Sequence, residues 1–71
     1  MDQYRIPYMN MIVREFGRRY KMTVQQAFRY LYRFKGIQHL DDFYDVEHLL
    51  PVDDTLHGLV AVCHKNGGRL R

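Results

Sequence analysis

Residues 22–36, MTVQQAFRYLYRFKG, decide the fold, because they carry the start, the buried face and the end of one helix. Thr23, followed three residues later by Gln26, forms a capping box in which each side chain satisfies a free backbone amide. Met22 before the cap can pack on Ala27 as a hydrophobic staple. Gly36 is predicted to end the helix as a left-handed cap. The three-and-four spacing predicts a buried face of Val24, Ala27, Phe28, Leu31 and Phe34.

The preceding segment, residues 6–20, has the same helical periodicity. Pro7 suits its first turn, where no backbone donor is needed. Gly17 costs about 1 kcal/mol relative to alanine inside a helix. Its position beside Phe16 therefore predicts a close approach between two helices. The predicted apolar face consists of Ile6, Met9, Ile12, Val13, Phe16 and Tyr20.

The second half of the chain predicts a short helix and a long one. A short helix of about two turns is expected from Ile37, Leu40 and Phe43. Residues 44–50 fit either irregular structure or one helical turn. The last helix opens at Pro51 and stops at Gly67-Gly68. Its apolar stripe is Val52, Leu56, Leu59, Val60 and Cys63.

These patterns predict an all-α fold, a compact bundle of three full helices plus one short helix. Residues 1–66 are expected to form a single helical domain, and residues 67–71 a flexible C-terminal tail. The single cysteine of the chain fits a reducing cytoplasm better than a disulfide-linked scaffold. No apolar run approaches the roughly 18 residues that span a bilayer. We therefore expect a cytoplasmic protein with no membrane contact.

Charge is divided unevenly along the chain. Residues 1–35 carry eight basic residues against two acidic ones, a net charge of +6, whereas residues 36–71 carry three against six, a net charge of −3. One end of such a molecule can attract an acidic partner. The alternative is that the two halves attract each other within the fold.

Basic residues repeat every four positions along the first two helices. Like charges at this spacing destabilise a helix slightly, so their placement indicates a use in binding. A solvated basic face is the alternative interpretation. Tyrosine and arginine are also the residues that dominate interface hot spots. The predicted partner-binding residues are Arg14, Arg18, Arg29, Tyr30, Tyr32 and Arg33.

Catalytic and metal-binding patterns are weak. Asp53, His57 and His64 share one face of the last helix, but their spacing is not a known ligand motif, so no metal or cofactor is predicted. His48 is interpreted as a buried structural histidine bonded to a backbone carbonyl rather than as an acid or base. Cys63 is expected to be buried and inert. The chain is therefore predicted not to be an enzyme.

Three segments resemble a small bacterial family known as a domain of unknown function, number 3791: residues 27–31 (AFRYL), 35–37 (KGI) and 43–48 (FYDVEH). The resemblance extends over roughly residues 8–65. In that family an aromatic-Asp-Val stretch ends in a histidine followed by a threonine, whereas Leu49 follows His48 here. Family members are often encoded beside proteins that resemble ADP-ribosyltransferases. The resemblance thus implies a small cognate partner protein, such as an antitoxin or immunity protein.

Two functions are carried forward from the sequence. The leading hypothesis is a non-enzymatic protein-binding module, antitoxin-like or immunity-like, that neutralises a cognate partner related to ADP-ribosyltransferases. The alternative is a small helix-turn-helix-like nucleic-acid-binding protein. In that case the short turn at Lys21-Met22 joins the first two helices, and the arginines of the second face the groove.

Overall fold

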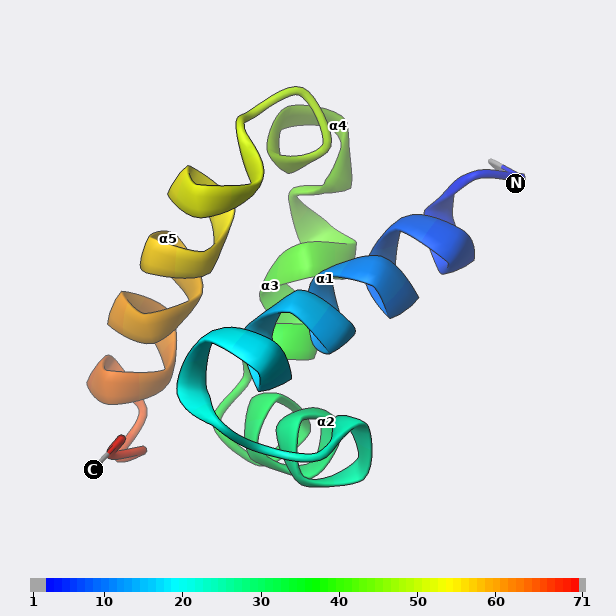
Figure 1. Cartoon of the computed structure of the whole chain (residues 1–71). Helices are drawn as coiled ribbons and strands as arrows, with labels where there is room; N and C mark the ends of the chain where they lie inside the picture. Colours follow the sequence, from blue (N-terminus) through cyan, green and yellow to red (C-terminus); the bar gives the residue numbers. More distant parts are fainter. Residues whose placement is uncertain (1–2, 71) are drawn as a thin grey trace.

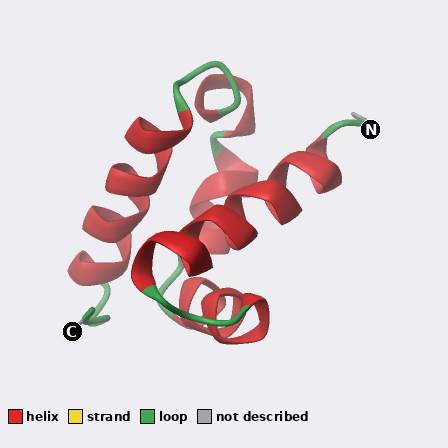
Figure 2. Ribbon diagram, in the orientation of Figure 1, coloured by secondary structure: helices red, strands yellow, loops and turns green. Residues whose placement is uncertain are grey.

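The computed structural model describes residues 3–70, which form helices and no strand (Figures 1 and 2). The helices are α1 (Arg5–Tyr20), α2 (Val24–Arg33), α3 (Gly36–Asp42), α4 (Tyr44–Glu47) and α5 (Val52–Lys65). The all-α prediction is confirmed. Residues 44–50, for which the sequence allows either irregular structure or one helical turn, contain the single-turn helix α4. The described chain therefore has one more short helix than predicted. None of the helices in residues 3–70 combines the length and apolar character that crossing a bilayer requires.

Helix α1 lies at the centre of the arrangement. It contacts α2, α3 and α5, and α3 in turn contacts α2, α4 and α5. In Figure 1, α1 crosses in front of α3, with α5 along one side and α2 below. The first and last described segments of the chain lie on opposite sides of the molecule. Every other long element is therefore positioned by its contact with α1.

Each helix contributes between one and three buried hydrophobic side chains to the core. The hydrophobic side chains that are almost completely buried are Ile12, Val13, Phe16, Ala27, Leu31, Leu40, Tyr44, Leu56, Leu59 and Cys63, and Thr55 is buried with them. The predicted burial of Cys63 is confirmed. Burial raises the pKa of its thiol to about 11, so the thiol stays protonated and unreactive at neutral pH.

A tight turn joins α1 to α2. Lys21 adopts a left-handed backbone conformation with φ of 59°, and the Met22 amide donates to the Gly17 carbonyl at 2.8 Å. The predicted capping box of α2 is confirmed in both directions. The Gln26 amide donates to Thr23 Oγ1 at 3.0 Å, and the Thr23 amide donates to Gln26 Oε1 at 2.9 Å.

Gly17 lies where α1 and the start of α2 approach most closely. A Cβ atom at Gly17 would lie 2.8 Å from the Met22 carbonyl oxygen and 3.4 Å from the Cβ of Ala27. The predicted close approach is therefore confirmed. Because Gly17 and Ala27 are both small, α2 packs on α1 with its Ala27–Leu31 stripe turned inward.

The predicted burial of Val24 and Phe28 is wrong. Val24 is 53% exposed and Phe28 is 49% exposed. With Ala27 and Leu31 facing α1, these two side chains lie on the neighbouring side of α2, at the edge of the contact. Ile6 and Phe43 are also exposed, although both belonged to predicted apolar faces.

The predicted role of Gly36 is also wrong. Lys35 takes the left-handed conformation, with φ of 71°, and Gly36 begins α3. A Cβ atom at Gly36 would lie 2.8 Å from Leu31 Cδ2 and 3.2 Å from Cys63 Sγ. The glycine therefore allows α3 to lie against α2 and α5.

Described residues 67–70 follow the surface of the helices. Gly67 has φ of +95°, Gly68 is buried beside Phe34 and Tyr30, and Leu70 is partly buried against the core. Residues 1–2 of the predicted domain and residue 71 of the predicted tail lie outside the described residues. Flexibility of the tail stays a prediction.

Substituting Gly17 tests the close approach. Gly17→Ala is expected to lower the free energy of unfolding by about 1–3 kcal/mol, the usual effect of overpacking, because the clash is with a backbone carbonyl. Gly58→Ala is the matched control, since a Cβ there meets nothing within 4 Å in the middle of α5. It is expected to raise that free energy by about 0.5–1 kcal/mol. Urea unfolding measures both; equal stability of the two variants would contradict the packing described.

Candidate protein-binding surface

Three exposed apolar side chains form a continuous row along α2. Val24, Phe28 and Tyr32 are four residues apart and therefore lie on one face of the helix. They are 53%, 49% and 69% exposed. The rings of Phe28 and Tyr32 stack with their centroids 5.9 Å apart and an interplanar angle of 16°. We call this row the α2 ridge.

Shallow hollows lie beside the ridge at both of its ends. One, of about 400 Å³, lies between α1 and α2, with Val13 and Arg14 on one side and Val24 and Phe28 on the other. The second, of about 530 Å³, lies beside Tyr32 and includes Met9 and Ile37. A ridge with hollows beside it can engage side chains of another protein on both flanks.

The arginines beside the ridge have no acidic partners. Arg29 lies three residues before Tyr32 and therefore shares its side of the helix, and Arg33 follows four residues after Arg29. Arg14 lines the hollow between α1 and α2. Within residues 3–70, none of these three side chains has a carboxylate within 4.0 Å. Their charge is available to a partner.

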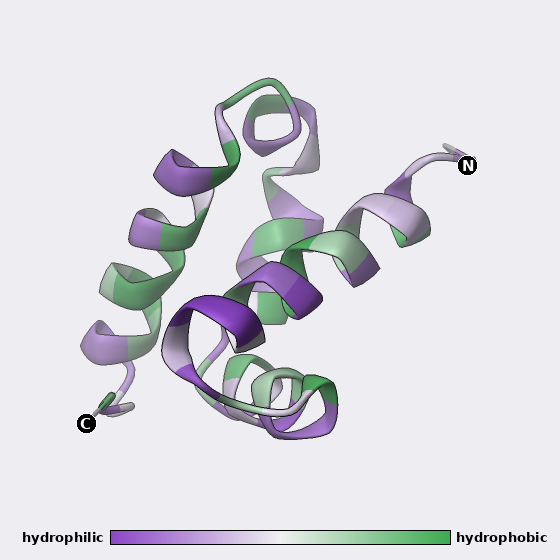
Figure 3. Ribbon diagram, viewed as in Figure 1, coloured by the Kyte–Doolittle hydropathy of each residue, from purple (hydrophilic) through white to green (hydrophobic). Residues whose placement is uncertain are grey.

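Attraction between the oppositely charged halves occurs elsewhere. Arg5 pairs with Asp41 at 2.8 Å, and Arg19 pairs with Asp53. Arg5 and Arg19 therefore attract the acidic half of the chain within the fold. The arginines beside the α2 ridge form no such ion pair within residues 3–70. The last turns of α1, which lead into α2, are strongly hydrophilic (Figure 3).

The structure brings four of the six predicted contact residues to this surface: Arg14, Arg29, Tyr32 and Arg33. The side chain of Arg18 is 80% exposed on α1 and lies 3.9 Å from Glu15. Tyr30 is partly buried on another side of α2, where its ring stacks on Phe16 at 5.9 Å. Burial raises the pKa of its hydroxyl.

Val24 and Phe28 are the members of this surface that the sequence analysis assigned to the core. One signal in the sequence could have identified them. Apolar residues extend around more of α2 than the side that α1 and α3 cover. The apolar side chains beyond the covered side, Val24 and Phe28, are therefore exposed.

His48 has a structural environment. Its Nδ1 donates to the Tyr44 carbonyl oxygen at 2.6 Å, which fixes the proton on Nδ1 because a carbonyl only accepts. The imidazole stacks on the Tyr44 ring with centroids 4.5 Å apart, and Tyr8 packs edge-on against both rings. The predicted bond to a backbone carbonyl is confirmed, although the His48 side chain is exposed rather than buried.

The acidic and histidine side chains of α5 do not gather into a metal site. Asp53 bonds to Arg19, while His57 and His64 are exposed. Across the part of the chain that the structure describes, no three His, Cys, Asp or Glu side chains are placed to hold a metal ion.

Comparison with known proteins gives one finding. Residues 7–66 match the model of a family described as "Protein of unknown function (DUF3791)". No curated protein and no solved structure matches the chain.

The ridge is expected to contribute little to the stability of the free protein. Phe28→Ala should lower the free energy of unfolding by less than about 1 kcal/mol, because the side chain is half exposed and loses mainly its stacking on Tyr32. The neighbouring core variant Leu31→Ala should lower it by about 2–5 kcal/mol, since Leu31 is fully buried. Chemical denaturation of both variants tests the distinction. A loss for Phe28→Ala as large as that for Leu31→Ala would assign Phe28 to the core.

Proposed function

The chain belongs to the DUF3791 family, and we propose that it is a non-enzymatic protein-binding module that docks a cognate protein through the α2 ridge and its arginines. The observation that carries the proposal is the exposure of the ridge. Val24, Phe28 and Tyr32 remain in water although α2 has a fully buried stripe of its own. Covering a large apolar side chain contributes about 1.5–3 kcal/mol, so a protein that covered the ridge would gain substantially.

The surroundings of the ridge define the chemistry of the partner. An apolar side chain of the partner would fill the hollow between α1 and α2, and carboxylates around it would pair with Arg14, Arg29 and Arg33. Opposite charges across an interface speed association and select the partner. The family resemblance adds a class of partner, a protein related to ADP-ribosyltransferases, which this chain would neutralise as an antitoxin or immunity protein does.

Nucleic-acid binding is the second candidate, because the guanidinium groups of Arg29 and Arg33 lack acidic partners in residues 3–70. The ridge argues against it. The row that adjoins these arginines is apolar and aromatic, whereas contacts to phosphate need hydrogen-bond donors.

Capture of the partner with single-residue variants tests the proposal. The tagged chain is used to recover proteins from a lysate of the source organism, and affinity is then measured with the recovered protein. Arg29→Glu and Phe28→Ala are each expected to weaken binding about tenfold or more, since both remove contacts at the centre of the interface. Lys65→Glu, which reverses one charge at the exposed end of α5, is the matched control and should change affinity less than about threefold.

Two outcomes would contradict this surface. Unchanged affinity for both Arg29→Glu and Phe28→Ala would exclude the α2 ridge. Recovery that disappears with nuclease, together with a steep loss of binding as salt rises, would favour nucleic acid instead.

A further inference from the structure

A second group of exposed apolar side chains lies where α3 ends and α4 leads towards α5. Its members are between 39% and 75% exposed: Phe43, Val46, Leu49 and Leu50. The Val46 and Glu47 amides donate to the Phe43 carbonyl, and the Leu50 amide donates to the Glu47 carbonyl, so the winding stays helical through this segment. The spacing of three and four therefore places Phe43, Val46 and Leu50 on one side. We call the four apolar residues the α4 row.

The inner side of this segment is attached to the core, which leaves the α4 row in water. Tyr44 is buried, and its ring packs edge-on against Tyr8 of α1 with centroids 5.6 Å apart. Glu47 Oε2 lies 3.4 Å from His39 Nε2 of α3, and both side chains are mostly covered. Because Tyr44 and Glu47 take the inward positions, the α4 row faces away from the core.

Two carboxylates adjoin the α4 row and have no partner. Asp42 directly precedes Phe43, and Asp45 directly precedes Val46. Both aspartates are exposed, and neither has a Lys, Arg or His nitrogen within 4.0 Å in residues 3–70. The α4 row thus combines apolar side chains with unpaired negative charge. The α2 ridge combines apolar side chains with unpaired positive charge, so the two surfaces are complementary.

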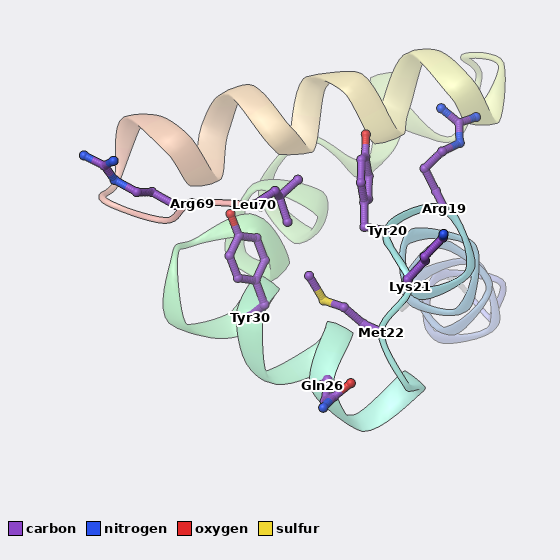
Figure 4. Close-up of a pocket in the computed structure, with 8 residues that line it drawn as sticks. All are labelled: Arg19, Tyr20, Lys21, Met22, Gln26, Tyr30, Arg69 and Leu70. Atoms are coloured by element: carbon purple, nitrogen blue, oxygen red, sulfur yellow. The ribbon is translucent and has the colours of Figure 1, made fainter.

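Another side of α2 is partly occupied by the chain itself. A Cβ atom at Gly68 would lie 2.8 Å from the Tyr30 hydroxyl oxygen, so the chain after α5 passes directly over that ring. Figure 4 shows Leu70 between Tyr20 and Tyr30, and Leu70 is partly buried against the core. The α2 ridge, by contrast, stays open to a second molecule.

We propose that the α4 row of one chain docks on the α2 ridge of a second copy. Residues 24–32 and residues 43–50 each extend over about two helical turns, so the two surfaces match in length. Apolar side chains would cover one another, and Asp42 and Asp45 would pair with Arg29 and Arg33 of the other copy. The inference rests on the α2 ridge being a docking surface, as the proposed function does, and needs no cognate protein.

The position of the two surfaces determines the kind of assembly. Helices α4 and α2 lie at opposite ends of the molecule (Figure 1), so each docked copy leaves one surface of each kind free. Such a head-to-tail contact adds further copies instead of closing as a two-fold dimer. The contact is small, below the roughly 1,200 Å² that stable interfaces bury, and is therefore weak. At a few micromolar the chain is monomeric, and the ridge is free for a cognate protein.

Sedimentation equilibrium of the full chain between about 10 µM and 1 mM tests self-association. The weight-average mass is expected to start at the 8.6 kDa of one chain and to rise about 1.5-fold or more at the highest concentration. A mass that stays at 8.6 kDa up to 1 mM would overturn the proposal.

Two single variants and their mixture test the head-to-tail arrangement. Phe28→Asp on the ridge and Val46→Asp on the α4 row should each remain at the mass of one chain. Mixed at 1 mM they should associate only as far as a 1:1 dimer, because the mixture retains one intact contact. Ala61→Asp, at an exposed position of α5 outside both surfaces, is the control and should associate as the native chain does.

Two results with these variants would overturn the proposal: a mixture that stays monomeric, or a Val46→Asp chain that still self-associates. Circular dichroism confirms that each variant folds. Tyr32→Asp, at a more exposed position of the ridge, takes the place of Phe28→Asp if that variant is unfolded.

Reversal of the charges tests the pairing between copies. Asp42→Lys with Asp45→Lys, and separately Arg29→Glu with Arg33→Glu, should weaken association about fivefold or more, since like charges would then meet. The chain with all four substitutions has the native net charge and should associate within about threefold of the native chain. A fourfold variant that folds and yet stays monomeric would contradict the complementarity on which the proposal depends.

The outcome is separable from that of the proposed function. A chain that stays monomeric at 1 mM but binds a cognate protein through Phe28 and Arg29 would refute self-docking alone. A chain that self-associates as described but binds no cognate protein would refute the proposed function alone.

Discussion

The contact between Gly17 of α1 and the start of α2 determines how the rest of the molecule is arranged. No side chain separates the two segments there, and the Met22 carbonyl occupies the place where a Cβ atom would lie. This contact fixes the rotation of α2 about its own axis. Ala27 and Leu31 turn inward, Val24, Phe28 and Tyr32 turn outward, and Tyr30 turns toward the end of α1. The exposure of the α2 ridge follows from that rotation.

The distribution of charge is explained by the same arrangement. Arg5 and Arg19 lie where acidic residues of the second half of the chain can reach them, and they form ion pairs with Asp41 and Asp53. The exposed arginines of α2 have no carboxylate within 4.0 Å in residues 3–70, although Arg33 and Asp41 line the same hollow. Exposed ion pairs contribute only about 0–1 kcal/mol to stability. The unpaired positive charge on α2 is the charge that the proposed docking surface would use.

Features that depend on neighbouring residues in the chain could be predicted from the sequence. The capping box of Thr23 and Gln26 and the burial of Cys63 at helical spacing are of this kind. The exposure of Val24 and Phe28 could not be predicted, because it depends on which face of α2 meets α1. The role of Gly36 could not be predicted for a similar reason. The sequence predicts a helix cap, whereas Gly36 allows α3 to lie against Leu31 and Cys63, which come from two other helices. Arg29 and Arg33 still lie on one side of α2, because a spacing of four residues keeps them together however the helix is rotated.

Hydroxyl-radical footprinting of the free chain and of its complex tests the central claim most directly, since it reports the solvent access of individual aromatic side chains. The account predicts that Phe28 and Tyr32 are oxidised readily in the free chain and are strongly protected in the complex. Phe43, which is 52% exposed in the segment between α3 and α4, should be oxidised equally in both. Protection of Phe43 without protection of Phe28 and Tyr32 would contradict the account and move the interface to the opposite end of the molecule.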